Sequence, residues 1–353
     1  MKIYPYLFLI IIISSCKKDT IEDPVFQEKY GKGMYVVTNL GINYLDYTIT
    51  NANVQKNIFE NVNNISIMNP KSIKINGNKG YIIGNRLYIV DIKTFALLGE
   101  VNGFYNAVKC DIISHNRAFV IDRGESLVKI VDLDNFEITG KIEVGDSTKP
   151  SFIISNDYKA FILNGGGQNY EKRDSTIISI DFKDRAIPIS EVTGTLKLDF
   201  NPTSAIWIYN PKILCKGIYN TNDPTNDTES SFFDISGFDN KIINNKTLTG
   251  VYNANNLIPN NDGSLSYFTA SDGIYQINNT TLNYNRILTN EASILQINFE
   301  NYQINDSTTY PVGMLYMNDI NNSNKIYKYN LFENTFQDTI NIEGEILDIQ
   351  FKN

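Results

Sequence analysis

The sequence predicts an all-β protein built from a repeated four-stranded unit. Short strands rich in Ile, Val, Tyr and Phe recur along the chain and end in Asn, Gly or Asp turns. No segment shows the apolar period of a helix. The strands also fall into groups of four that return every roughly 40 to 50 residues, which is the repeat length of a β-propeller blade.

The clearest unit has expected strands at residues 71–75, 80–83, 87–91 and 97–101. Two units copy it, with strands at 107–113, 118–121, 128–132 and 138–142, and then at 151–154, 160–163, 178–181 and 192–194. Each copy repeats an Asp in the third strand and a Gly in the fourth, namely Asp91, Asp132 and Asp181, and Gly99, Gly140 and Gly194. The Asp carboxylates are expected to stabilise the turns beside them.

Three fainter units follow. Their strands are expected at 204–209, 213–218, 232–235 and 248–251, then at 256–259, 265–269, 274–277 and 286–288, and finally at 294–299, 313–317, 326–329 and 339–342. The pattern therefore continues almost to the end of the chain.

The two ends of the repeat region are incomplete in complementary ways. The first unit starts at residues 34–39, which match the second strand of the template, and continues with strands expected at 43–49 and 56–62. The last segment, residues 345–351, matches the first strand. Sharing one blade would close the ring and remove exposed sheet edges. The sequence thus predicts a seven-bladed β-propeller over residues 33–353, closed by N- and C-terminal strands that share one blade.

Two motifs resemble the YVTN-type β-propeller repeat. One is Tyr35-Val36-Val37-Thr38-Asn39, and the other is the Ile-Val-Asp strand followed by a Thr-Phe or Asn-Phe turn. The resemblance covers nearly all of residues 33 to 352, and the chain is similar to propeller lipoproteins of Bacteroidetes surfaces. Some proteins of that group capture ligands such as corrinoids beside TonB-dependent transporters. The resemblance implies a binding propeller and supplies no catalytic motif.

The N-terminus resembles a bacterial lipoprotein signal. Lys2 precedes an apolar run over residues 7–13, and Ile13-Ser14-Ser15-Cys16 resembles a lipobox. The resemblance implies a signal peptide of residues 1–15 and lipidation of Cys16. Acyl chains on this residue would anchor the mature protein to a membrane.

Residues 16–32 are expected to form the lipidated Cys and a flexible acidic tether. An acidic stretch soon after a lipidated Cys is similar to the surface-export signal of Bacteroidetes lipoproteins. We therefore expect a protein that is lipid-anchored in the outer membrane and exposed at the cell surface. A propeller that faces the periplasm is the alternative.

Composition excludes several function classes. The chain has one His and three Cys, so a His-rich metal site or a disulfide-rich scaffold cannot be built, and we expect no metal or cofactor. The formal net charge of −8 argues against nucleic acid as a partner. His115 is expected in an exposed turn, while Cys110 and Cys215 are expected as buried thiols.

Candidate ligand-binding residues lie in the loops that join blades and the loops that join second to third strands. Both kinds of loop reach the same face of a propeller. The blade-joining loops place Asn69, Tyr105, Asn106, Lys149 and Asn201 around the channel mouth, where aromatic rings and amides suit polar ligands. Tyr170 and Arg173 extend a long loop of the fourth unit. Long loops in units four, five and seven fit binding segments and neutral insertions equally well.

These observations favour a non-catalytic propeller that binds a small molecule or glycan, such as a corrinoid-like cofactor or an oligosaccharide, for a TonB-dependent outer-membrane transporter. Neither a Gly-x-Ser-x-Gly elbow nor an HExxH helix occurs in the sequence. Two alternatives stay open. One is a platform for protein–protein interaction at the outer membrane, and the other is a propeller hydrolase or lyase that uses carboxylates.

Overall fold

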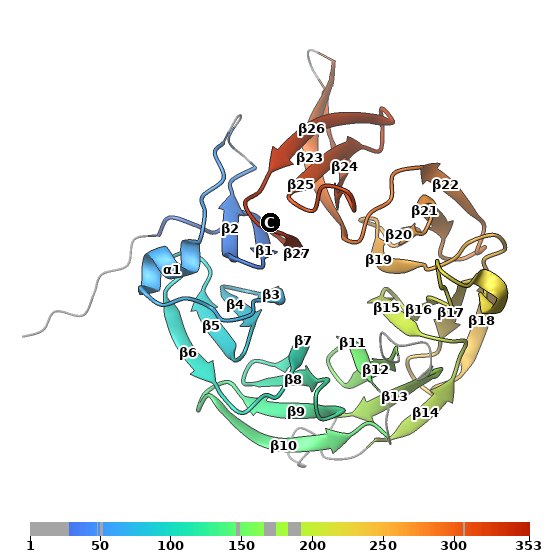
Figure 1. The fold of residues 1–353 in the computed structure, drawn as a ribbon, viewed down its shortest axis with the longest axis horizontal. Helices are drawn as coiled ribbons and strands as arrows, with labels where there is room; N and C mark the ends of the chain where they lie inside the picture. Colours follow the sequence, from blue (N-terminus) through green and yellow to red (C-terminus); the bar gives the residue numbers. More distant parts are fainter. Residues whose placement is uncertain are drawn as a thin grey trace, which may run out of the picture.

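The protein is a closed ring of seven β-sheets, seen along its axis in Figure 1. The computed structural model describes residues 28–47, 49, 52–145, 149–165, 174–182, 192–305 and 308–353. In each complete blade the four strands are antiparallel and follow chain order from the axis to the rim. The predicted all-β, seven-bladed β-propeller is confirmed.

Blade 2 contains β3 (Ser72–Asn76), β4 (Lys79–Ile83), β5 (Leu87–Asp91) and β6 (Leu97–Val101), and blade 3 contains β7 (Ala107–Ser114), β8 (Arg117–Asp122), β9 (Leu127–Asp132) and β10 (Glu137–Glu143). Blade 4 contains β11 (Pro150–Ser155), β12 (Lys159–Asn164), β13 (Thr176–Asp181) and β14 (Gly194–Lys197). Blade 5 contains β15 (Pro202–Trp207), β16 (Pro211–Cys215), β17 (Ser231–Ile235) and β18 (Ile242–Thr247). The short 3-10 helix η1 (Pro224–Asn226) lies between β16 and β17.

Blade 6 contains β19 (Asn255–Pro259), β20 (Leu265–Ala270), β21 (Gly273–Asn278) and β22 (Tyr284–Leu288). Blade 7 contains β23 (Leu295–Asn305), β24 (Thr308–Asn318), β25 (Lys325–Asn330) and β26 (Thr335–Asn341). The β23–β24 pair is longer than the sequence predicted, and its hairpin projects beyond the ring in Figure 1.

Blade 1 closes the ring with strands from both ends of the chain. β1 (Gly33–Thr38) pairs with β2 (Gly41–Leu45) on one side and with β27 (Ile346–Lys352) on the other. This is the shared blade that the incomplete ends predicted. The expected fourth strand at residues 56–62 is wrong, because the segment forms the helix α1 (Ile58–Asn63) instead.

The spacing of apolar side chains explains why α1 is helical. Ile58 and Phe59 are buried, and Val62 packs against the same cluster. In a strand, Ile58 and Phe59 would point to opposite faces, whereas a helical turn brings all three side chains to one side. An antiparallel bridge between Tyr44 and Gln55 continues the sheet beyond β2.

Two other fourth strands differ from the prediction. In blade 4 the strand is β14, which begins at Gly194 rather than ending there. In blade 5 it is β18, whose six residues are all exposed, and the expected strand at 248–251 is wrong. Leu248 and Val251 are buried in the cluster between blades 5 and 6. They are apolar because they pack between the blades, and they do not belong to a strand.

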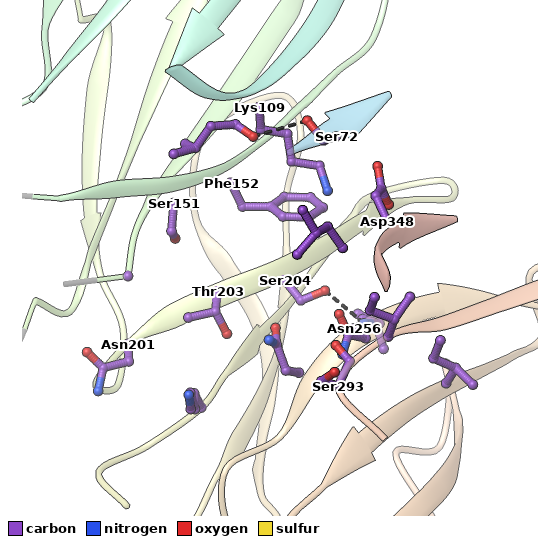
Figure 2. Close-up of a pocket in the computed structure, with 18 of the residues that line it drawn as sticks. Ser72, Lys109, Ser151, Phe152, Asn201, Thr203, Ser204, Asn256, Ser293 and Asp348 are labelled. Carbon is purple, nitrogen blue, oxygen red and sulfur yellow. Dashed lines mark hydrogen bonds between the residues drawn. The ribbon is translucent and has the colours of Figure 1, made fainter. Parts of the chain in front are cut away.

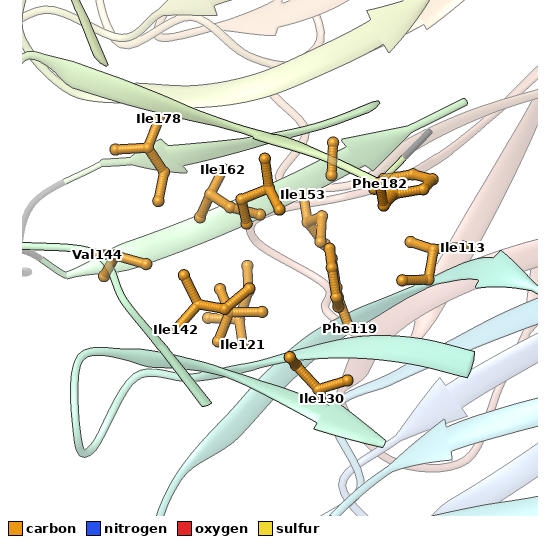
Figure 3. Packing of buried hydrophobic residues seen from close by; sticks show 13 residues of the cluster. Ile113, Phe119, Ile121, Ile130, Ile142, Val144, Ile153, Ile162, Ile178 and Phe182 are labelled. Atoms are coloured by element: carbon orange, nitrogen blue, oxygen red, sulfur yellow. The ribbon is translucent and has the colours of Figure 1, made fainter. Parts of the chain in front are cut away.

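The core of the described residues consists of seven apolar clusters, one at each junction between neighbouring blades. Figure 3 shows the junction of blades 3 and 4, where Phe119 and Ile130 face Ile153 and Phe182. The junction of blades 1 and 2 is rich in aromatic rings, and Tyr35 and Phe95 stack there with ring centroids 5.8 Å apart. Each sheet is therefore buried on both faces, which fits their near-continuous apolar strands.

Two of the three recurring third-strand Asp residues stabilise turns as predicted. Asp91 Oδ1 accepts hydrogen bonds from the N–H groups of Lys93 and Thr94, and Asp132 Oδ1 accepts from those of Asp134 and Asn135. Blades 6 and 7 use an Asn at the same position, in Asn278 and Asn330. The turn after Asp181 lies outside the described residues. The carboxylate of Asp181 pairs with Lys159.

Candidate binding site

A cavity of about 580 Å³ lies on the ring axis, lined by the first strands of the blades. Lys71, Arg123, Gly165, Asn201 and Lys216 line it at the face that carries the blade-joining loops and the loops between second and third strands. This is the face on which the sequence placed its candidate residues. Figure 2 shows polar side chains converging on this space from several strands.

β-Bulges in four consecutive blades shape the cavity wall. The pairing of the first and second strands skips a residue between Ala107 and Lys109, between Pro150 and Phe152, and between Pro202 and Ser204, and it shifts again between Asn255 and Ile258. The residues left out of register are Val108, Ser151, Thr203, Asn256 and Leu257, and all five line the cavity. A bulge redirects side chains locally, so residues outside the regular strand register contribute to the cavity wall.

Polar side chains also join the first strands of neighbouring blades. Ser72 Oγ donates to the carbonyl oxygen of Val108 at 3.1 Å, and Ser204 Oγ accepts from the N–H of Leu257 at 2.7 Å. Asp348 Oδ2 accepts from the N–H of Ile73 at 3.0 Å, linking β27 to β3. These contacts hold the cavity wall in place while leaving part of its polar surface open to a ligand.

Cationic side chains gather in the cavity. Lys71, Lys109, Arg123 and Lys216 line it. Burial lowers the pKa of Lys71, Arg123 and Lys216, because each loses hydration of its charge. Lys109 Nζ lies 4.3 Å from the ring centroid of Phe152, in cation–π geometry.

Asp348 is the one acidic side chain among the described residues that line this cavity. Burial raises its pKa, while Lys109 and the N–H groups of Ile73 and Ile349 oppose that rise. Figure 2 shows Lys109, Phe152 and Asp348 together on one side of the cavity. Thr203 Oγ1 is buried in the wall and has no hydrogen-bond partner within the described part of the chain.

A second cavity of about 270 Å³ continues along the axis toward the opposite face. It shares Ser72, Lys109, Phe152 and Gln296 with the first. In the wall of this second cavity, Lys74 Nζ pairs with Asp111 Oδ1 at 2.8 Å, and Ser155 Oγ donates to Asp111 Oδ2 at 2.8 Å. Lys74, unlike the lysines at the mouth, is therefore paired with a carboxylate.

The structure places the predicted site residues at different distances from the cavity. Asn201 lines it, with its side-chain amide donating to the carbonyl of Gly217 at 2.7 Å. Asn106 supports it, because Asn106 Oδ1 accepts from Lys71 Nζ at 2.5 Å. Lys149 Nζ lies 3.4 Å from Ser126 Oγ, at the same face.

Asn69 and Tyr105 lie in exposed loops at this face and are not among the cavity-lining residues. The N–H of Tyr105 donates to Asp122 Oδ2 at 2.7 Å, which fixes the loop that carries Asn106. Tyr170, Arg173 and the lipidation candidate Cys16 lie outside the described residues.

Most of the cavity wall was not predicted from the sequence, including Lys109, Thr203, Lys216 and Asp348. A signal for several of them exists in the sequence. First strands buried between blades should be apolar, yet β7, β19 and β27 carry Lys109, Asn256 and Asp348. Polar residues at matching positions of the innermost strands therefore mark side chains that face the axis.

The remaining chemistry-bearing residues have structural positions. Cys110 and Cys215 are buried free thiols, as expected, and burial raises the pKa of Cys110 to about 12. His115 is exposed in the turn between β7 and β8, also as expected. The described residues contain no group of three or more His, Cys, Asp or Glu side chains placed to hold a metal ion. No described helix is long and apolar enough to span a membrane.

Comparisons with known proteins identify the fold. No protein-family model matches the chain, and no curated protein matches it in sequence. Among solved structures, hydrazine synthase of Kuenenia stuttgartiensis is similar with a TM-score of 0.58 and 13% identity, over 80% of this chain and 90% of that one.

Apo AztD from Citrobacter koseri is similar with a TM-score of 0.53 and 11% identity, over 91% of this chain and 98% of that one. The computationally designed protein Ika8 has a TM-score of 0.52 and 11% identity, over 81% and 91% of the two chains. At such low identity these similarities show a common fold alone.

Proposed function

We propose that this protein is a non-catalytic binding propeller that captures a small molecule or glycan in the axial cavity. The observation that carries the proposal is the cavity itself. Its volume of about 580 Å³ falls within the range of roughly 300 to 1,000 Å³ common for ligand sites. Hydroxyl, amide and ammonium groups from several blades converge there, and such convergent polar groups orient ligands.

We further propose that Cys16 anchors the protein by lipid to the outer membrane, at the cell surface, beside a TonB-dependent transporter. The lipobox-like sequence and the resemblance to Bacteroidetes surface lipoproteins support this part. Eleven residues separate Cys16 from Glu28. Fully extended, this tether would reach about 40 Å.

The start of the described chain supports a particular orientation on the membrane. The N–H groups of Lys29 and Tyr30 donate to the carbonyl of Lys93, in the turn between β5 and β6. Turns between third and fourth strands lie on the face opposite the cavity mouth. An anchor that approaches this face would leave the mouth directed away from the membrane, where a ligand can enter.

A thermal-shift panel of corrinoids, haem and neutral oligosaccharides tests ligand capture. A compound that binds the folded state raises Tm by mass action, by an amount that grows with its concentration over Kd. We expect at least one class to raise Tm. A flat response across the panel would favour the interaction-platform alternative, which pull-down from outer-membrane extract would then test.

Proteolysis of intact cells tests the location. A surface-exposed propeller should be released or degraded when protease is added to whole cells, while a periplasmic marker stays intact. Complete protection of the propeller, together with cleavage after the outer membrane is permeabilised, would place it in the periplasm and overturn the surface assignment.

The enzymatic alternative makes a distinct prediction through Asp348. A hydrolase or lyase that works in this cavity would need a carboxylate there, and Asp348 is the acidic residue found among the described lining side chains. Turnover of an oligosaccharide that Asp348→Asn abolishes would refute the non-catalytic assignment.

A further inference from the structure

The cavity mouth concentrates positive charge in a protein that is acidic overall. The formal net charge of the chain is −8. Among the described lining residues, the three lysines Lys71, Lys109 and Lys216 lie with a single carboxylate, Asp348. This local excess opposes the charge of the whole molecule, so the overall composition does not account for it.

Other lysines with little exposure behave differently. Lys129, Lys159 and Lys212 have side chains at most 10% exposed, and each forms an ion pair. Their partners are Asp122, Asp181 and Asp234. Lysine burial in this fold is thus ordinarily accompanied by a carboxylate, as the cost of desolvating a charge requires.

The mouth lysines lack such partners within the described residues. Lys71 Nζ donates to two neutral acceptors, Asn106 Oδ1 at 2.5 Å and the carbonyl of Ala107 at 2.6 Å. Lys109 rests over Phe152, and Lys216 Nζ makes neither an ion pair nor a hydrogen bond in the described part of the chain. Asp348 can offset one of these charges at most.

Burial lowers the pKa of both Lys71 and Lys216. The charge of Asp122 opposes this for Lys71 without outweighing it, and no charged group opposes it for Lys216 within the described residues. The three lysines come from different blades: Lys71 from blade 2, Lys109 from blade 3 and Lys216 from blade 5. They therefore converge from separate sides of the cavity, an arrangement suited to a ligand with more than one negative group.

We propose that the cavity binds a small molecule carrying two or more anionic groups, whether carboxylate, phosphate or sulfate. This inference rests on the proposed function, since it names the chemical class of the ligand captured in the same cavity. Anionic oxygens would complete the interactions of Lys71, Lys109 and Lys216 with charge-assisted hydrogen bonds. Phe152 and the wall hydroxyls would contact the uncharged part of the ligand.

The test compares matched probes by isothermal titration and thermal shift. Trigalacturonate, citrate and pyrophosphate serve as anionic probes, and maltotriose serves as a neutral trisaccharide of similar size. We expect at least one anionic probe to bind, with an affinity that falls as salt is raised, and maltotriose to bind at least about tenfold more weakly. The three anionic probes distinguish a sugar acid, a simple polycarboxylate and a phosphate.

Variants of Lys71 and Lys216 locate the site. Lys216→Met and Lys71→Met should each weaken binding of the anionic probe by about tenfold or more, because each removes a charge-assisted contact. Lys216→Arg should retain most of the affinity. Lys246→Met, on the exposed strand β18 of blade 5, is the matched control and should bind like the parent protein. Apo variants should keep the parent Tm, which confirms folding.

The outcomes separate this inference from the proposed function. Binding of maltotriose without binding of any anionic probe would keep the proposed function and overturn the inference. Anion binding that survives both Lys→Met variants would place the anion elsewhere and also overturn it. A flat response to all four probes at about 10 mM, alongside a flat panel of corrinoids, haem and neutral oligosaccharides, would count against both.

Discussion

Removing the carboxylate of Asp122 should destabilise the propeller and loosen the cavity mouth. The side chain of Asp122 is fully buried. It accepts hydrogen bonds from the N–H groups of Tyr105 at 2.7 Å, Asn106 at 2.8 Å and Gly124 at 3.2 Å. Its other partner is Lys129 Nζ at 2.9 Å. One side chain thus fixes both loops of blade 3 that reach the mouth.

The expected size follows from these partners. Asp122→Ala leaves Lys129 with Glu125 and the carbonyl of Gly103, and it removes the acceptor of three part-buried N–H groups. Breaking a buried ion pair by removing one partner costs about 3 to 5 kcal/mol. For a domain of this size that corresponds to a Tm lower by about 5 to 10 °C.

Differential scanning calorimetry measures the effect, with Asp134→Ala as the control because Asp134 is an exposed turn residue. A fall in Tm of less than about 2 °C, or an equal fall in the control, would refute the assigned role of Asp122.

The same residue gives a pH dependence of defined sign. Burial alone would raise the pKa of Asp122, but the hydrogen bond from Lys129 and the backbone N–H donors outweigh it and hold the pKa below its ordinary value. The folded state therefore binds the proton less readily than the unfolded chain. This stability is present above the unfolded pKa of about 4 and is lost as pH falls through the folded pKa. Unfolding below about pH 4 should lose part of its pH dependence in Asp122→Ala.

Three further predictions test the fold. Gly217→Ala should lower the free energy of unfolding by several kcal/mol, since φ is +76° and the new Cβ would lie 2.4 Å from a backbone oxygen. Gly77→Ala, whose Cβ would meet open space, should lower it by about 1 kcal/mol, and urea unfolding compares the two variants. Phe59→Ala should cost about 3 to 5 kcal/mol in the same assay if α1 is part of the core, and a cost below 1 kcal/mol would contradict that. Cys110 and Cys215 should resist maleimide at pH 7.5 in native protein and react after denaturation; rapid native labelling would contradict their burial.

The architecture was predictable because each blade repeats local chemistry. The carboxylates of Asp91 and Asp132 indicate turns, and the extra strand expected at residues 345–351 indicates ring closure. Both patterns can be recognised in one sequence without an alignment. The helix α1 was missed because three apolar residues within five positions fit a short strand as well as a helical turn. Strand β18 was missed because an exposed edge strand needs no apolar residues.

The candidate site was only partly predictable. Asn106 and Asn201 were found because blade-joining loops must reach one face. Val108 and Thr203 were not, since they reach the cavity through β-bulges that shift register by one residue, and sequence periodicity does not reveal such a shift. The positive charge of the mouth comes from Lys71, Lys109 and Lys216, which lie in three different blades. Their proximity could not be predicted before the arrangement of the blades around the ring was known.

The most direct test of the account is a crystal structure of the protein with the tightest-binding probe from the two panels. We predict the ligand in the axial cavity, with its polar groups within hydrogen-bond distance of Lys71, Lys109 or Lys216. A ligand bound at the rim of the ring, or on the face that carries the turn after β5, would contradict the claim that the axial cavity is the binding site.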